Sequence, residues 1–242
     1  MTIIVAPFYN EEENIENFLR QFIPLKKILE IKRLVLVNDG STDSSSRIVR
    51  RFLKKLPITL VNISPNQGPG NAFQEGIVTA LKLAKRTDIV CTLESDMTSD
   101  LSILPMMKDK IKKGADVVLA SCFAKGGGIE GVDFQREFLS WSVNTFLRFF
   151  FRIPGASTYS SFYRVYTTYI LQKVLQTNGT FFSEKGFVCM TELLIRMHRV
   201  GAKIDEVPMI LRWTARKGKS KMKVFKTIRS YLRILLRYGV GQ

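Results

Sequence analysis

Short runs of β-branched residues alternate with amphipathic stretches along the first half of the chain, and this order constrains the fold most strongly. The amphipathic stretches repeat apolar residues at helical spacing, as Ile15, Phe18 and Phe22 do. Strands joined by helices in this way pair in parallel and need helices on both faces of their sheet. The pattern therefore predicts an α/β fold with a mostly parallel central sheet. The expected strands cover residues 3–6, 34–38, 58–62, 89–93 and 117–120.

The second half of the chain departs from this order after a run of three glycines at 126–128. We find no internal repeat and no linker that divides the chain. We therefore expect one domain over residues 1–221, followed by a basic amphipathic helix and tail over 222–242. The other expected elements are an aromatic-rich helix over about 134–151, a helix over 189–200 and a strand over 204–207.

Basic residues outnumber acidic ones by 37 to 21, which gives a formal net charge of +16. From position 208 to the end there are ten basic residues and no acidic one. Such a charge calls for an acidic partner, which is nucleic acid, an anionic membrane or a phosphorylated substrate. Three widely spaced cysteines argue against a disulfide framework or a zinc site and fit a reducing compartment. No uncharged apolar run reaches the length of a membrane span, so we expect a soluble chain that can still sit on a membrane.

Polar clusters follow each of the first four expected strands. Ligands of parallel sheets bind in the crevice beyond the carboxyl ends of the strands, which is where these clusters stand. Each cluster alone can be an ordinary turn or a solvated strand end. Four of them at successive strand ends indicate a binding site. The clusters are Pro7-Phe8-Tyr9-Asn10-Glu11, Val37-Asn38-Asp39-Gly40-Ser41-Thr42-Asp43, Asn66-Gln67-Gly68-Pro69-Gly70-Asn71-Ala72 and Glu94-Ser95-Asp96.

Together these clusters resemble the motifs of inverting family 2 glycosyltransferases, which have the GT-A fold. The resemblance covers almost the whole chain and is nearest to the synthases of dolichol- and polyprenyl-phosphate sugars such as mannose. It implies an enzyme that moves a sugar from a nucleoside diphosphate donor to an acceptor. Later signatures of that branch are Arg136 with Ser140, residues 160–164, Glu206-Val207-Pro208 and residues 216–221.

The resemblance also implies roles for the residues at the strand ends. Glu94 and Asp96 would hold Mg²⁺ or Mn²⁺ against the donor diphosphate, because hard cations take oxygen ligands and leave positions for phosphate. Asp39 would accept a hydrogen bond from the base, and Arg216 and Lys221 would donate to the phosphates. The full set expected to bind the nucleotide sugar is Pro7, Tyr9, Glu11, Asp39, Ser95, Asp96, Arg216 and Lys221.

An acceptor phosphate is expected at three residues of the second half. Arg136 and Ser140 lie four residues apart and therefore share a helix face. Arg164 is the third member of this set. The residues expected to take part in catalysis are Asp96, Arg136 and Glu192.

Several positions depart from the family pattern. Glu94 stands where Asp is usual, and Cys122 and Trp141 replace basic residues of the lipid-phosphate branch, which argues against a lipid-phosphate acceptor. Leu193 stands where members that glycosylate hydroxyls carry an Asp as general base. Because a phosphate oxygen is already ionised and a hydroxyl is not, the missing base favours a phosphate acceptor. Glu192 stays open as a substitute base.

The stretch 222–238 has one apolar and one basic face, which suits an anionic membrane surface or packing against its own domain. The sequence thus predicts a metal-dependent inverting glycosyltransferase that acts on a polyprenyl phosphate and is peripherally bound at the cytoplasmic membrane face. The alternatives are transfer to a hydroxyl of a glycan or other acceptor, a basic nucleic-acid-binding protein, and a non-catalytic member. Nucleic acid is not expected as a partner, because no nucleic-acid-binding module is recognisable.

Overall fold

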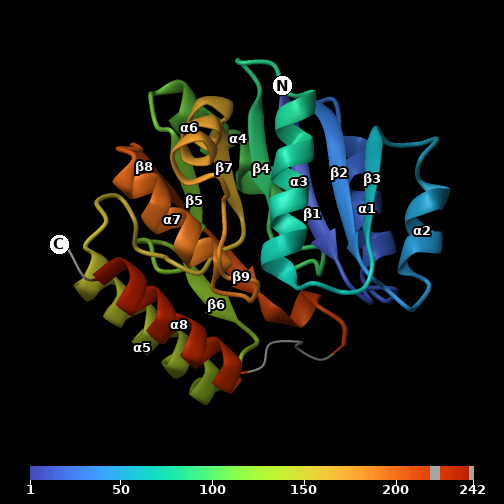
Figure 1. Ribbon diagram of the computed structural model, residues 1–242. Coiled ribbons are helices and arrows are strands. Elements are labelled where there is room, and N and C mark those ends of the chain that lie inside the picture. Colours follow the sequence, from blue (N-terminus) through green and yellow to red (C-terminus); the bar gives the residue numbers. More distant parts are fainter. Residues whose placement is uncertain (219–223, 240–242) are drawn as a thin grey trace.

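A seven-stranded sheet forms the centre of the computed structural model, which describes residues 1–218 and 224–239 (Figure 1). Its strand order is β3-β2-β1-β4-β7-β5-β8, and all neighbours pair in parallel except β7, which is antiparallel to β4 and β5. The expected mostly parallel sheet is therefore confirmed. The strands are β1 (Thr2–Phe8), β2 (Ile31–Asp39), β3 (Ile58–Ile63), β4 (Ile89–Thr92), β5 (Val117–Ser121), β7 (Arg164–Thr167) and β8 (Ile204–Pro208), and β6 (Gly128–Glu130) and β9 (Ile210–Arg212) form a separate parallel pair.

Strand β1 shows why the first half of the chain folds this way. Ile3 and Val5 belong to the apolar cluster on one face of the sheet, and Ile4 and Ala6 belong to the cluster on the other. All four side chains are 0% exposed. Successive side chains of a strand point to opposite faces, so a central strand covered on both faces must be apolar at every position. This continuous apolar run is the pattern from which the strand is predicted.

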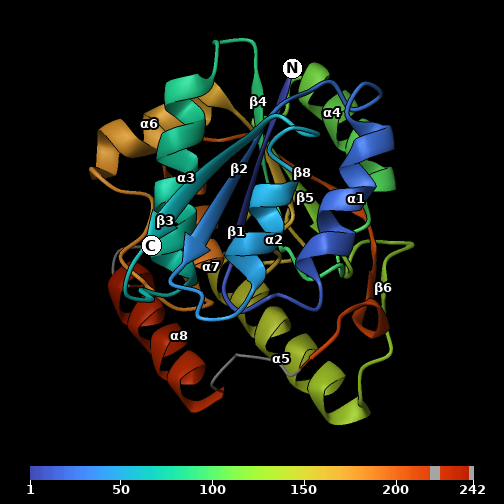
Figure 2. The ribbon, with the colours of Figure 1, turned by 90° about the vertical axis from the view of Figure 1, so that its right-hand side faces the viewer.

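Helices cover both faces of the sheet (Figure 2). One face buries Phe18 of α1, Val49 of α2 and Leu104 of α4. The other buries Phe73 of α3 and Ile170 of α6, together with side chains of α5, α7 and α8. The helices expected over 134–151 and 189–200 are confirmed as α5 and α7. The helices are α1 (Ile15–Leu25), α2 (Ser45–Arg51), α3 (Pro69–Leu83), α4 (Leu104–Lys112), α5 (Phe134–Phe151), α6 (Thr168–Asn178), α7 (Cys189–Arg199) and α8 (Val224–Gly239), with short 3₁₀ turns at Leu101–Ile103 and Trp213–Ala215.

Strand β7 and helix α6 are not predicted from the sequence. β7 has four residues, and it is held between β4 and β5. Arg164, its first residue, pairs with Thr92 on one side and Leu119 on the other. Pairing with two strands that are distant in the sequence therefore forms β7. Its four residues are too few to show an alternation of apolar and polar side chains that would predict a strand.

Helices α5 and α8 lie at the end of the molecule toward which β1 runs (Figures 1 and 2). Their last turns touch, since a Cβ added at Gly239 would lie 2.6 Å from the ring of Phe150. Ile234 and Tyr238 of α8 are buried in the cluster that also contains residues of α7. The expected C-terminal helix is thus present and packs on the domain through one face. The expected boundary between 221 and 222 lies outside the described residues, as do 240–242.

Candidate functional site

The clusters that follow the strands come together at the carboxyl edge of the sheet. β1 lies between β2 and β4, so the segments after these three strands are neighbours. The hydroxyl of Ser95 donates to the carbonyl oxygen of Pro7 at 2.9 Å, which ties the segment after β4 to the end of β1. The backbone N–H of Thr42 donates to Oδ1 of Asn10 at 2.8 Å, which ties the segments after β1 and β2. Tyr9 is half-buried in the same edge.

Asp39 organises the loop that leads into α3. Its Oδ1 accepts from the backbone N–H of Gln67 at 2.8 Å, and its Oδ2 accepts from that of Gly68 and from Nδ2 of Asn66, both at 2.9 Å. Gly68 has a φ of 92°, and a Cβ there would lie 2.7 Å from the carbonyl oxygen of Lys185, so only glycine fits. Burial raises the pKa of Asp39, and the two backbone donors oppose this. A carboxylate has about four lone-pair sites, so one remains for a ligand.

Three acidic side chains gather near Arg216. Asp96 is 5% exposed, and its Oδ1 accepts from the hydroxyl of Thr98 at 2.7 Å. Its Oδ2 lies 3.2 Å from Nη1 of Arg216. Burial and the neighbouring charges of Asp96 and Glu11 raise the pKa of Glu94 to about 8, and Arg216 acts in the opposite direction. The cluster therefore brings three carboxyl groups and one guanidinium together.

Glu94 and Asp96 fit a hard divalent cation. Among the described residues, Glu94 accepts no hydrogen bond and makes no ion pair, so its oxygens are available. The raised pKa of Glu94 beside a second acid favours the binding of a positive ion. Within residues 1–218 and 224–239, no group of three or more acidic, histidine or cysteine side chains is placed to hold an ion. Two carboxylates would leave most coordination positions to water and substrate phosphate, which is how Mg²⁺ is usually held.

Asn14 is a site residue that sequence reasoning missed. Its Nδ2 donates to the carbonyl oxygen of Lys217 at 3.0 Å, and the backbone N–H of Lys217 donates to its Oδ1 at 2.9 Å. The same Nδ2 donates to Oε2 of Glu11 at 2.7 Å. Asn14 stands at the N-cap of α1, yet its side chain makes no capping hydrogen bond. It fastens the backbone next to Arg216 instead, and only the structure reveals this because the two partners are 203 residues apart.

Glu192 is fully buried in α7 and holds three parts of the chain together. Its Oε2 accepts from the backbone N–H groups of Ser183 and Glu184, both at 2.8 Å. Its Oε1 accepts from Nη2 of Arg196 at 2.8 Å and from the hydroxyl of Tyr238 at 2.7 Å. These bonds occupy the carboxylate and close it off from solvent. The expectation that Glu192 acts in catalysis, as a substitute base, is therefore wrong in this structure.

Arg164 is also placed in the core. It is fully buried, and it donates to the carbonyl oxygens of Ser161, Met190 and Tyr159 at 2.7, 2.7 and 2.8 Å. Burial lowers the pKa of its guanidinium. As the first residue of β7, it is drawn into the middle of the sheet, where no acceptor can reach it. The expectation that Arg164 binds the acceptor phosphate is therefore wrong.

Comparison with known families decides what this arrangement belongs to. The sequence profile of Glycosyl transferase family 2 matches residues 3–175, which include all four strand-end clusters. The chain belongs to this family. The protein is therefore a glycosyltransferase, and the resemblance seen in its motifs is confirmed.

Relatives of this family 2 glycosyltransferase include two enzymes named for lipid-phosphate sugars. The chain is 26% identical over 234 residues to the dolichol-phosphate mannosyltransferase of Pyrococcus furiosus, an alignment that covers 97% of this chain and 62% of that one. It is 24% identical over 224 residues to the polyprenol monophosphomannose synthase of Mycolicibacterium smegmatis, covering 91% of this chain and 80% of that one. The chain thus spans less than two thirds of the length of the Pyrococcus relative.

A solved structure confirms the fold. Glucosyl-3-phosphoglycerate synthase of Mycobacterium tuberculosis, in complex with Mn²⁺, uridine diphosphate and glucosyl-3-phosphoglycerate, superposes with a TM-score of 0.70. The match covers 100% of this chain and 81% of that one at 17% identity. At this identity the likeness concerns the fold alone, which is the GT-A fold.

Two of the expected acceptor residues of this glycosyltransferase lie on α5. Ser140 is half-buried in the first half of the helix, and Arg136 precedes it by about one turn. The side chain of Arg136 lies outside the described residues, and so does Lys221. Their roles at the acceptor and at the donor phosphates stay predictions.

Proposed function

We propose that this family 2 glycosyltransferase moves a sugar from a nucleoside diphosphate sugar to a polyprenyl phosphate, with inversion at the anomeric carbon, at the cytoplasmic face of a membrane. The observation that carries the proposal is the buried pairing of Asp96 with Arg216 beside Glu94 at the carboxyl edge of the sheet. A diphosphate donor requires carboxylates that hold a cation and a guanidinium that contacts its phosphates, and both are present here.

The donor would lie along this edge. The guanidinium of Arg216 contacts Asp96 through Nη1, and an arginine can offer further N–H groups to phosphate oxygens. Its position is set by Asn14, which fastens the backbone of Lys217. The remaining lone pair of Asp39 is available to an N–H of the base, while its other three bonds keep the neighbouring loop in place.

Glu94 and Asp96 would hold Mg²⁺ or Mn²⁺. Such an ion, when bound, neutralises charge that develops on the leaving diphosphate. The Mycobacterium tuberculosis structure contains Mn²⁺ together with uridine diphosphate, which supports a divalent ion in this fold. The guanidinium of Arg216 would neutralise the same developing charge, and it stays protonated throughout.

The acceptor side supports a phosphate rather than a hydroxyl. Glu192, the carboxylate that could have served as base for a hydroxyl, is occupied by five hydrogen bonds and is fully buried. Leu193 beside it is an apolar core residue. An ionised phosphate oxygen attacks without losing a proton, so an acceptor of this kind does not need a base. The names of the two relatives, which refer to dolichol phosphate and polyprenol phosphate, point the same way.

The outer faces of α5 and α8 support binding at a membrane. Phe149 of α5 is 71% exposed and Phe225 of α8 is 90% exposed. Contiguous apolar surface of this kind marks an interaction site, and aromatic rings beside basic residues suit the boundary of an anionic bilayer. Among the helices that the structure describes, none has the length and apolar character to cross a membrane. The other large exposed apolar side chains of the two helices are Phe134, Phe138, Leu139, Trp141, Phe146, Ile228, Leu232 and Leu236.

Nucleotide release tests the proposal. We would incubate the protein with UDP- and GDP-sugars, Mn²⁺ or Mg²⁺, and polyprenyl phosphate dispersed in detergent. We expect release from one donor class, and we expect a chelator to abolish it. Release that continues unchanged with the chelator would contradict the metal requirement. If folded protein binds nucleotide but releases it from none of the donors, the proposed reaction is wrong.

A further inference from the structure

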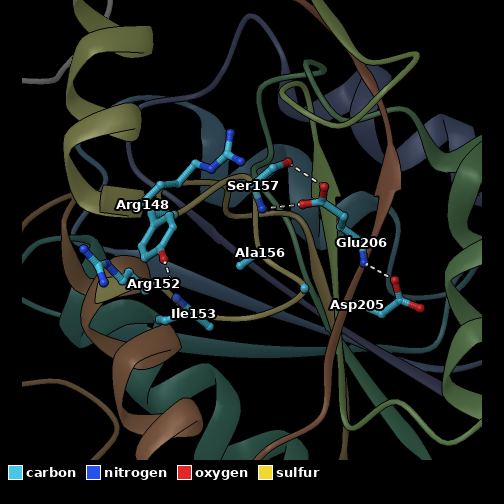
Figure 3. Close-up of a pocket in the computed structure, with 9 residues that line it drawn as sticks. Arg148, Arg152, Ile153, Ala156, Ser157, Asp205 and Glu206 are labelled. Carbon is cyan, nitrogen blue, oxygen red and sulfur yellow. Dashed lines mark hydrogen bonds between the residues drawn. The ribbon is translucent and has the colours of Figure 1, made fainter. Parts of the chain in front are cut away.

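A pocket away from the acid cluster lies between the end of α5 and the edge strand β8. Its volume is about 510 Å³, which is within the usual range for small-molecule sites. Figure 3 shows Arg148 and Arg152 on one side of it and Asp205 and Glu206 on the other. The remaining lining residues are Ile153, Gly155, Ala156, Ser157 and Tyr159.

The acids of the pocket already have partners. Oδ2 of Asp205 lies 2.8 Å from Nζ of Lys110. Oε2 of Glu206 accepts from the backbone N–H of Ser157 at 2.7 Å, and its other oxygen accepts from the hydroxyl of the same serine. Both carboxylates are therefore used in holding the loop and strand β8 together.

The arginines of the pocket have no acidic partner in the part of the chain that the structure describes. Among the described residues, neither Arg148 nor Arg152 makes an ion pair, and both side chains are exposed. Within the described part of the chain, the side chain of Arg152 makes one hydrogen bond, from Nε to the carbonyl oxygen of Phe149 at 3.2 Å, which leaves its outer N–H groups available. Figure 3 shows the two guanidinium groups pointing apart, so both exposed side chains would turn into the pocket to hold one anion, a rotamer change that is common on binding. Phosphate has the geometry that matches two such groups.

The backbone of Arg152 is a second sign that its side chain has a use. Its φ is 45°, in the left-handed region that glycine adopts most easily. Glycine is the common residue at this position after a helix, and an arginine there is less favourable because its Cβ is crowded at positive φ. The helix C-terminus attracts cations, but an arginine within the last turn would serve that purpose without the unfavourable φ.

The pocket adjoins the exposed aromatic surface of α5. Phe146 and Phe149 are exposed, and the guanidinium of Arg152 lies 5.4 Å from the ring centre of Phe149. A group that binds the arginines is thus next to rings that suit the acyl boundary of a bilayer. This arrangement fits the headgroup of an anionic phospholipid, with its phosphate at the arginines and its chains toward the phenylalanines.

We propose that the pocket between α5 and β8 binds the phosphate of an anionic lipid headgroup through Arg148 and Arg152. The site is separate from the acid cluster and from the expected acceptor residues Arg136 and Ser140. It rests on the proposed function only for the presence of a membrane. It would fix the orientation of the enzyme on the bilayer, since one phosphate would anchor the end of α5.

Co-sedimentation with vesicles tests this site without donor or acceptor. The vesicles contain phosphatidylcholine alone or with an equal part of phosphatidylglycerol. Arg148→Gln/Arg152→Gln removes both ligands, and Arg148→Lys/Arg152→Lys keeps the charge but loses the planar fork. Arg50→Gln/Arg51→Gln on α2 removes the same charge from exposed positions elsewhere. Inorganic phosphate, titrated by calorimetry, replaces the vesicle in a second arm.

We expect the glutamine pair to weaken binding to the anionic vesicles by about 30-fold and the lysine pair by about tenfold, with the α2 control close to wild type. Saturable binding of inorganic phosphate that the glutamine pair abolishes would assign the same chemistry to a free phosphate. A lysine pair that binds like wild type, or a glutamine pair no weaker than the α2 control, would overturn the site. Transfer to detergent-dispersed acceptor, measured in parallel, stays unchanged in all variants, so failure of the pocket and failure of the reaction are distinguishable.

Discussion

The carboxyl edge of the sheet and the outer face of α5 and α8 place their side chains in opposite ways. At the edge, charged groups are buried and held by partners, as Asp96 is by Thr98 and Arg216. On the helices, Phe149 and Phe225 are exposed to solvent. Buried and fixed polar groups suit a small, highly charged ligand whose position matters for chemistry. Exposed apolar rings suit an extended surface, where area counts more than position.

The largest expected effect comes from removing Asp96, the acid at the centre of the carboxyl edge. We expect Asp96→Asn to lower kcat/KM for nucleotide release by about 100-fold or more, because a preorganised charge and a metal ligand are lost together. Asp109→Asn, an exposed acid of α4, is the matched control and should leave the rate unchanged. Turnover of Asp96→Asn equal to wild type would show that the edge is not the reaction centre.

A second substitution separates a buried charge that acts on substrate from one that only holds the fold. We expect Glu192→Gln to destabilise the protein by about 3 kcal/mol. The buried Arg196 would lose its counter-ion, and the NH₂ group of the glutamine amide would face groups that also donate hydrogen bonds. Chemical denaturation measures this loss, and exposed Glu75→Gln is the control. The kcat per folded molecule should stay near wild type. Loss of kcat with unchanged stability would restore Glu192 as a base.

Asn14 tests whether the carboxyl edge of the sheet depends on hydrogen bonds between segments that are far apart in the sequence. We expect Asn14→Ala to raise the KM for the donor by about tenfold with a smaller effect on kcat, because the backbone beside Arg216 would no longer be held. Asn178→Ala, which removes one local amide bond on α6, is the control. In a double-mutant cycle, Asn14→Ala should add little to Arg216→Ala. Fully additive effects would contradict the positioning role.

Sequence reasoning captured the features that depend on local pattern. The continuous apolar run of β1 and the acidic triplet after β4 could be read directly, because burial on both faces and position after a strand leave a local trace. Arg164 and Glu192 could not, since their roles depend on partners that other segments bring to them. A basic residue in a loop-like stretch and an acid on an amphipathic helix look available until the carbonyls of Tyr159 and Met190, or the hydroxyl of Tyr238, are in place.

The smallest expected effect lies where the two regions meet. Nε and Nη2 of Arg233 on α8 donate to the two oxygens of Glu184 at 2.9 and 2.8 Å, and this pairing lowers the pKa of Glu184 below its usual 4.5. Because Arg233 is 45% exposed, we expect Arg233→Gln to cost about 1 kcal/mol at neutral pH. Exposed Arg229→Gln on the same helix should cost almost nothing.

The pH dependence of this pair has a definite sign. A lowered folded-state pKa gives stability that is present above the unfolded value and is lost as pH falls through the folded value. The difference in unfolding free energy between wild type and Arg233→Gln should therefore be constant above about pH 5 and shrink below the usual glutamate value of 4.5. A difference that grows on acidification would contradict the ion pair.

The nature of the acceptor is the central claim, and one comparison tests it most directly. Nucleotide release would be measured with a polyprenyl phosphate, with the corresponding polyprenol, and with neither lipid, at the same donor and metal concentrations. Our account predicts release that depends on the phosphate and is absent with the alcohol. An ionised phosphate oxygen needs no base, and Glu192, which could have served as one, is fully buried and hydrogen-bonded. Equal release with the alcohol would contradict it.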